Sequence, residues 1–210
     1  MNTRHRQHKH FWRNVMKTTV KILLTFVLFA SSIMMVQAQV LKMAGSSKIW
    51  IDGTSTLHDW KCTCKGVTAT FSIPESVFAA KPGEDVDLKT TINVPVKQIF
   101  NEKEDLMENL QEALDAEKFA TIKYTATDAS VVSSDATKAT VKTTGKVSIH
   151  GVEKVISFNV NITKSATGME VKGVANINMK DHGVDPPTMM LGTIKTGKDV
   201  KIGFDLDLTK

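Results

Sequence analysis

Residues 200–209 read VKIGFDLDLT, and their pattern decides the fold class of this chain. Apolar side chains occupy every second position from Val200 to Leu208, with polar residues or glycine between them. Successive side chains of a β-strand point to opposite faces, so this alternation indicates a strand with one dry face. The sequence predicts roughly eight or nine such strands in antiparallel sheets. The other candidates lie at 48–52, 67–73, 86–94, 121–127, 138–143, 146–150, 156–162 and 170–179.

Turn signals separate these strands at intervals typical of hairpins. No long polar linker or internal repeat divides the chain, so we expect a short N-terminal tail over 39–47 and one domain over 48–210. An all-β domain of this size forms a closed barrel or a sandwich, and an eight-stranded barrel has room for one elongated apolar ligand. The turns are predicted at 81–85, 133–135, 150–151, 167–168 and 196–199.

Residues 101–118 have the period of a helix instead of a strand. Asn101, followed by Glu104 three positions later, is typical of a helix N-cap. The polar face is strongly acidic over 102–117. We predict one amphipathic helix that lays its apolar face on the open end, or mouth, of the barrel. That face consists of Leu106, Met107, Leu110, Ala113 and Leu114.

The first 38 residues have the order of a secretory signal peptide. A basic region over 1–21 precedes an apolar run over 22–36, and the segment ends on short side chains at Ala38. The alternative is a membrane anchor, but the run is shorter than the roughly 20 residues that cross a bilayer core. We therefore expect cleavage near Ala38 and a mature protein that is periplasmic or secreted.

Charge and motifs argue against two classes of function. Six of the 27 basic side chains, including every arginine, lie in the leader, so 21 basic residues face 22 acidic ones in the remainder. A chain without arginine or net positive charge lacks the means to bind nucleic acid. The sequence also has no nucleophile elbow, zinc-protease motif or phosphate-binding loop, so we expect neither an enzyme nor a cofactor.

The two cysteines leave one alternative open. Cys62 and Cys64 point to the same face of a strand, where a bridge between them would be tight, so we favour two thiols over a disulfide. His58 lies close by in sequence, and His182 would complete a zinc or copper site of a redox or hydrolytic protein. The C-x-C spacing is not that of a usual zinc knuckle, so a metal site is only the second interpretation.

Four stretches carry a resemblance to a known family. Residues 50–60 (WIDGTSTLHDW), 114–124 (LDAEKFATIKY), 145–154 (GKVSIHGVEK) and 178–184 (NMKDHGV) resemble, in this order, the YceI-like family of exported lipid- or polyisoprenoid-binding proteins. The resemblance implies an eight-stranded antiparallel lipocalin-like barrel, a helix near its mouth and an interior that holds a long isoprenoid or fatty chain. This chain departs from the family pattern at Ala120, Lys180 and His182, which stand where proline, arginine and an aromatic residue are usual.

The first functional hypothesis is a carrier or sequestering protein for an apolar lipid, with transient membrane contact and a dimer both left open. A ligand-free barrel that docks partners on its acidic helix face is a further alternative. Besides the helix, the apolar loop 185–192 suggests a greasy opening, because loops are commonly polar. The candidate lipid-binding residues are Leu57, Trp60, Met107, Leu110, Leu114, Phe119, Met179, Met189 and Met190, with His150 and His182 for a polar head group.

Overall fold

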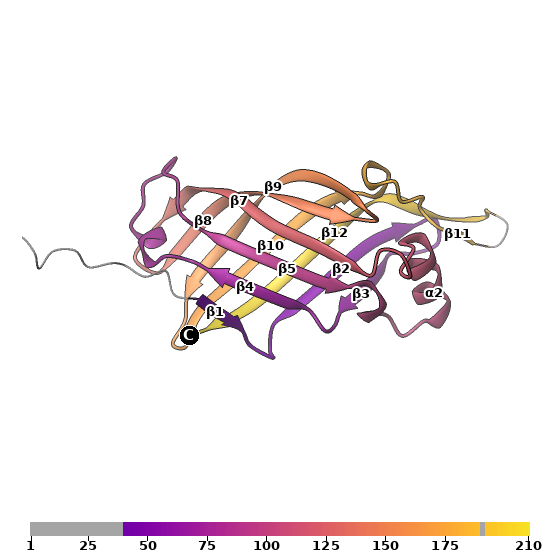
Figure 1. Cartoon of the computed structure of the whole chain (residues 1–210), viewed down its shortest axis with the longest axis horizontal. Helices are drawn as coiled ribbons and strands as arrows, with labels where there is room; N and C mark the ends of the chain where they lie inside the picture. The colour runs from indigo at the N-terminus through magenta and orange to yellow at the C-terminus, as the bar shows by residue number, and fades with distance from the viewer. Residues whose placement is uncertain (1–39, 190–191) are drawn as a thin grey trace, which may run out of the picture. The chain divides into compact units, whose positions relative to one another are not determined.

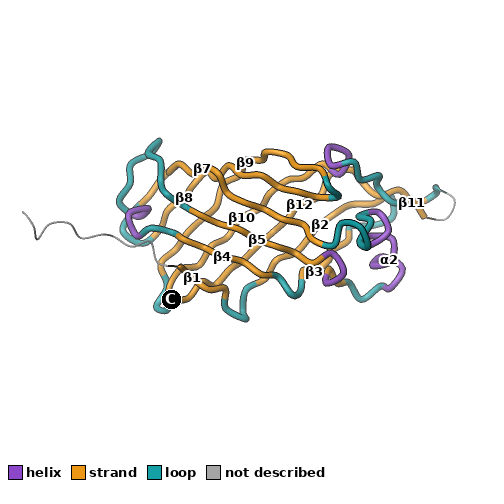
Figure 2. Tube along the Cα trace, viewed as in Figure 1, coloured by secondary structure: helices purple, strands orange, loops and turns teal. Residues whose placement is uncertain are grey.

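The computed structural model describes residues 40–189 and 192–210. The predicted signal peptide over 1–38 and the candidate Met190 lie outside the described residues. Strands dominate the described part, and Figures 1 and 2 show them wrapped around a common axis with short helical segments at the two ends. Within the described ranges, none of the helices is long and apolar enough to cross a membrane.

Eight strands form a closed antiparallel barrel, which confirms the predicted fold class. The segment 39–47, expected as a tail, supplies the first of them, because Leu41 pairs with Phe71 on one side and Met43 pairs with Leu208 on the other. The pairing of β1 with β12 closes the barrel. In order around it, the strands are β1 (Val40–Met43), β4 (Thr68–Ser72), β5 (Lys89–Pro95), β7 (Thr121–Ser134), β8 (Lys138–Ile149), β9 (Val152–Lys164), β10 (Gly168–Asn178) and β12 (Ile194–Thr209).

Further strands continue the wall at the end that carries helix α2 (Glu104–Ala113). There β2 (Lys48–Ser55) takes the place of β1 along β12, and β3 (Trp60–Cys64) pairs with β2. A 3-10 segment, η2 (Val96–Gln98), leads from β5 into β6 (Ile99–Phe100), which pairs with β3. The last short strand, β11 (Thr188–Met189), pairs with the beginning of β12.

Two features predicted from local composition are wrong. Residues 196–199, expected as a turn, lie inside β12, whose register with β2 shifts between Thr196 and Val200. Glycine inside a strand marks a bulge as readily as a turn, and a Cβ on Gly197 would collide with Thr54. The expected gap between strands at 138–143 and 146–150 is also absent, because β8 continues through Gly145.

The predicted helix is present but shorter than expected. It begins at Glu104, whereas the predicted segment 101–118 begins at Asn101. Lys103 occupies the N-cap position, and its side chain makes no capping hydrogen bond. The side chain of Asn101 is bound elsewhere. Its Oδ1 accepts from the backbone N–H of Lys103 (2.7 Å), and its Nδ2 donates to the carbonyl of Lys61 (2.6 Å). The predicted Asn101 cap is therefore wrong, because these bonds form a turn before the helix.

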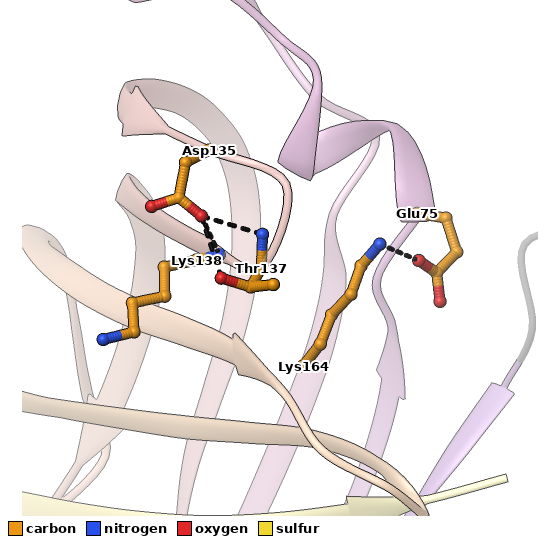
Figure 3. A network of polar contacts seen from close by, with 5 residues as sticks. All are labelled: Glu75, Asp135, Thr137, Lys138 and Lys164. Carbon is orange, nitrogen blue, oxygen red and sulfur yellow. Dashed lines mark hydrogen bonds and ion pairs between the residues drawn. The ribbon is translucent and has the colours of Figure 1, made fainter.

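The half of the barrel remote from α2, which we call the closed half, is filled with side chains. The 3-10 segment η1 (Glu75–Phe78) buries Val77 and Phe78 among the wall residues. The ammonium group of Lys164 ties η1 to β9, since it lies 3.2 Å from a Glu75 carboxylate oxygen (Figure 3). It also lies 4.5 Å from the centre of the Phe78 ring. The buried wall residues of this half include Leu41, Ile49, Phe71, Val131, Val141, Val160, Ile162, Met169, Val171, Leu206 and Leu208.

Hairpin turns connect neighbouring strands at the solvent-facing end of this half. The carboxylate of Asp135 accepts hydrogen bonds from the backbone N–H groups of Thr137 (2.8 Å) and Lys138 (2.9 Å), as Figure 3 shows. These bonds stabilise the ionised form and hold the pKa of Asp135 below its usual value. The turn between β7 and β8 is thus fixed by a single side chain.

The other half of the barrel, which we call the open half, lies under α2. An aromatic layer separates the two halves: the rings of Tyr124 and Phe158 lie 5.5 Å apart, and those of Phe158 and Phe204 lie 6.0 Å apart. Gly173 makes room for this layer, because a Cβ there would lie 2.5 Å from the Phe204 ring. The buried cluster of the open half consists of Ile51, Cys62, Val94, Ile99, Val147, Ile149, Ile177, Val184 and Val200.

Candidate functional site

The open half contains a cavity of about 510 Å³ between the barrel wall and α2. This volume lies within the roughly 300–1,000 Å³ of typical small-molecule sites. Its surface is mostly hydrocarbon, and such a surface gives up contact with water readily to another apolar group. The apolar side chains that line it are Ile51, Leu57, Trp60, Leu106, Leu110, Ala113, Leu114, Ile122, Ile149, Ile177, Met179, Val184, Pro187, Ile194, Val200 and Ile202.

The strands and the helix make different contributions to this lining. The strands present branched side chains such as Ile51, Ile177 and Val200, all nearly buried. The helix presents Leu106 and Leu110, but α2 has no fully buried residue. The helix therefore covers the cavity without filling it.

The cavity reaches the surface at a polar rim. Leu57, which is 67% exposed, lies there beside His58, and both backbone N–H groups donate to the hydroxyl of Ser55. The ammonium group of Lys103 lies 3.0 Å from Nε2 of His58. The neighbouring Glu104 also lines the opening. The site thus has an apolar interior and a mouth of mixed charge.

One polar side chain of the described cavity lining is buried. His182, in the 3-10 segment η3 (Met179–His182), is 2% exposed and lines the cavity. Its Nδ1 is 3.1 Å from the carbonyl oxygen of Val152, at the beginning of β9. A buried polar ring in an apolar cavity is costly unless it is hydrogen-bonded, so this contact holds the ring in place.

The structure brings together about half of the residues predicted from the sequence. In the cavity lining it places Leu57, Trp60, Leu110, Leu114, Met179 and His182. Their contact with a lipid stays a prediction. The backbone of Met189 belongs to β11, and nothing is described of its side chain.

Three predicted residues do not line the cavity. Met107 is half-buried, but the helix face toward the cavity is that of Leu106 and Leu110. Phe119 and His150 pack edge to face on each other, with ring centroids 4.8 Å apart, at the hairpin between β8 and β9. His150 has a positive φ of 50°, as the first residue of that tight turn. These two rings therefore stabilise a turn near the site.

Sequence reasoning missed several lining residues because only the fold gathers them. Ile51 and Ile177 belong to strands whose inward faces were predicted, but nothing local tells which half of a strand borders a void. Pro187 lies in the apolar loop 185–192 and Ile194 follows it, and the composition of that loop was the available signal. Lys103 reaches the rim because it precedes the first turn of α2.

The cysteines are thiols on the inner face of β3, where Cys62 is buried and Cys64 is half-buried. Both are free, and Cys62 belongs to the open-half cluster. Burial raises the pKa of Cys62 to about 11 and that of Cys64 to about 12, because a thiolate is poorly solvated there. Among the described residues, no group of three or more His, Cys, Asp or Glu side chains could hold a metal ion. The set His58, Cys62, Cys64 and His182 is therefore not gathered into a metal site.

Comparison with known proteins gives a family. The family model of the YceI-like domain matches residues 31–208, which is most of the chain. No curated protein matches the sequence.

Solved structures share the barrel at low sequence identity. BcnA of Burkholderia cenocepacia has a TM-score of 0.62 at 14% identity, over 78% of this chain and 96% of that one. A polyisoprenoid binding domain from Saccharophagus degradans, implicated in plant cell wall breakdown, has a TM-score of 0.58 at 12% identity, over 81% and 97%. The YceI protein of Campylobacter jejuni has a TM-score of 0.53 at 18% identity, over 71% and 84%. At these identities the likeness shows the fold alone.

Proposed function

We propose that this chain, which belongs to the YceI-like family, binds the hydrocarbon chain of a single lipid in the cavity of its open half. The observation that carries the proposal is the cavity itself, about 510 Å³ of apolar-lined space inside a barrel whose other half is filled. The similar domain from Saccharophagus degradans is named as polyisoprenoid-binding. An isoprenoid or fatty-acyl chain is the ligand class that these observations support.

The driving force is the transfer of hydrocarbon out of water. Each buried CH₂ group contributes about 0.8 kcal/mol, less the cost of ordering the chain. A ligand that buries about ten such groups therefore binds with few polar contacts, and no chemical step is required of the protein. The half-buried face of α2 supplies the part of the lining that can adjust, because its side chains have room to change rotamer.

The role of the protein is transport or sequestration of that lipid outside the cytoplasm. This part of the proposal depends on the leader over 1–38, with cleavage near Ala38. Expression of the full chain and N-terminal sequencing of the exported product test it. A mature protein beginning at Gln39 supports the proposal, whereas a chain retained in the membrane with its leader contradicts it.

Lipid binding is tested by mass spectrometry of an organic extract of the exported protein, purified without detergent. The variant Val200→Trp places a large ring in the cavity, since Val200 is a buried lining residue. Val174→Trp is the matched control, because Val174 is 48% exposed and does not line the cavity. We expect one apolar species, near one per chain, in the wild type and in Val174→Trp, and its loss in Val200→Trp.

If the expression host lacks the natural lipid, binding of an added lipid tests the proposal instead. Delipidated wild type should bind a fluorescent fatty-acyl probe, and Val200→Trp should bind it at least about tenfold more weakly, a loss of about 1.4 kcal/mol. Equal binding by both proteins would contradict the cavity as the site. No binding by the wild type would favour a ligand-free interaction module.

A further inference from the structure

The orientation of His182 in the cavity wall fixes which of its ring nitrogens carries the hydrogen. Nδ1 lies 3.1 Å from the carbonyl oxygen of Val152. A carbonyl oxygen only accepts hydrogen bonds, so Nδ1 must be the donor. In the neutral ring, a hydrogen on Nδ1 leaves Nε2 as a bare acceptor.

The backbone around His182 holds the ring in this orientation. The side chain of Asn178 accepts from the backbone N–H of Lys180 at the start of η3 (3.0 Å). Gly183, in the left-handed region at φ 69°, ends the segment, and the N–H of Val184 donates to the carbonyl of Met179 (3.1 Å). Both ends of η3 are therefore fixed, and His182 cannot turn its Nε2 toward Val152 without breaking the Nδ1 bond.

The second ring nitrogen is the one available to a ligand. Among residues 40–189 and 192–210, no hydrogen bond joins Nε2 to a protein group, and no unpartnered side-chain nitrogen or oxygen is fully enclosed by protein. His182 is 2% exposed and lines the cavity, so Nε2 borders that space.

We propose that the neutral ring of His182 accepts, at Nε2, a hydrogen bond from the bound lipid, which makes that lipid a long-chain alcohol or phenol rather than an anionic lipid. This inference rests on the proposed function, because it adds a polar anchor to the same cavity. A hydroxyl satisfies the buried acceptor, whereas an ether, a carboxylate or a phosphate brings only acceptors to it. A ligand without a donor leaves the nitrogen dry and unpaired, and loses affinity for that reason.

Two isomers that differ in the donor alone test the inference. Dodecan-1-ol and 1-methoxyundecane have the same composition, but only the alcohol donates a hydrogen bond. We expect delipidated wild type to bind the alcohol about tenfold more tightly, the factor that about 1.4 kcal/mol gives for one satisfied buried acceptor. Competition against a fluorescent fatty-acyl probe measures both affinities.

Variants then locate the acceptor. In His182→Phe the preference for the alcohol should be abolished or reversed, because the acceptor is gone and the buried hydroxyl of the alcohol has no partner. His150→Phe is the matched control, since that ring packs on Phe119 outside the cavity, and it should keep the preference for the alcohol. If His182→Phe fails to fold, imidazole ¹⁵N spectra of the wild type replace it: the Nε2 signal of His182 should shift with the alcohol and not with the ether.

The outcomes distinguish the inference about a hydrogen-bond donor from the proposed function of lipid binding. Equal affinity of the wild type for both isomers overturns the donor inference and leaves apolar binding intact. A preference that persists in His182→Phe, or an unshifted Nε2 signal, assigns the acceptor to another group and also overturns it. Failure of both isomers to bind, with the cavity delipidated, overturns the proposed function itself.

Discussion

The closed and open halves of the barrel both have aliphatic walls, but the interior of one half is filled with side chains and that of the other contains a cavity. β12 supplies Leu206 and Leu208 to the closed half and Val200 to the open half, and β10 supplies Val171 and Ile177 in the same way. All of these side chains are aliphatic and nearly buried. One half is nevertheless filled, and the other holds a cavity of about 510 Å³.

The element that covers each end makes the difference. η1 carries Val77 and Phe78 into the closed half, where they are 0% and 5% exposed. α2 lies over the open half without a single fully buried residue. The wall residues specify a barrel. Whether its interior is packed or left for a ligand depends on how far the covering segment, η1 or α2, inserts its side chains.

The largest expected effect comes from the same substitution in each half. Val141→Trp should lower the free energy of unfolding by about 3 kcal/mol or more, because Val141 is 0% exposed in the closed half and overpacking has no free volume to use. Val200→Trp should lower it by less than about 1 kcal/mol, because the ring enters an existing cavity. Urea unfolding followed by circular dichroism measures both, and equal losses would mean that the open half is packed.

Removing side-chain volume should give the same order, with the larger loss of stability again in the closed half. Ile162→Ala, at a residue 0% exposed in the closed half, should cost about 3–5 kcal/mol, since it leaves a new cavity. Ile177→Ala enlarges a cavity that already exists, so it should cost only about 1–2 kcal/mol. The same unfolding experiment applies, and a larger loss for Ile177→Ala would contradict the assignment of the halves.

Local periodicity predicted the strands because burial alternates with the backbone itself. The inward positions Val200, Leu206 and Leu208 follow from the sequence alone. The bulge around Gly197 could not be predicted, because it depends on the pairing of β12 with β2, which lies more than a hundred residues earlier in the chain. Glycine composition is the same in a turn and in a bulge.

The residues of the site could be predicted where a single helix or strand determines their positions. Helical spacing found Leu110 and Leu114, but it does not tell on which side of the apolar face the cavity lies, so Met107 was included and Leu106 was not singled out. His182 was predicted together with His150 as a contact for a polar head group, and only His182 lines the cavity. The tautomer that makes it an acceptor depends on the carbonyl of Val152, 30 residues away, and only the fold shows that.

Alkaline pH should loosen the open half before the closed half. Folding raises the pKa of Cys62 and Cys64 above the ordinary thiol value of 9.0, to about 11 and about 12. As the pH rises, the thiols of the unfolded chain therefore lose their protons before those of the folded protein. The contribution of the two protonated thiols to the free energy of unfolding is complete below about pH 9 and is lost as the pH rises through about 11–12. Amide hydrogen exchange in reducing buffer should show faster opening of β3 in this range.

The double variant Cys62→Ser and Cys64→Ser is the control for the alkaline effect. Its stability should depend less on pH in the same range, although burial also raises the pKa of Tyr124 and leaves a residual slope. An unchanged pH profile would assign the alkaline loss to other groups.

The smallest expected effect concerns the ion pair that ties η1 to β9. Lys164→Gln should lower the free energy of unfolding by no more than about 1 kcal/mol, because both side chains are partly exposed and an exposed pair contributes little. Lys103→Gln, at the rim of the open half, should change stability even less. A loss above about 2 kcal/mol for Lys164→Gln would show that the η1 cover depends on this pair rather than on burial of Phe78.

The position of β12 in the barrel also sets the order in which the protein can fold. This strand pairs with β10, β2 and β1, and Lys42 meets Thr209 across the closing seam. The hairpins from β7 to β10 join neighbours in sequence, so they can form while the chain is still being synthesised. The seam cannot form until residues 194–209 have left the ribosome. Until then the edges of β1 and β10 stay unpaired, and an unpaired strand edge is a template for pairing with another chain.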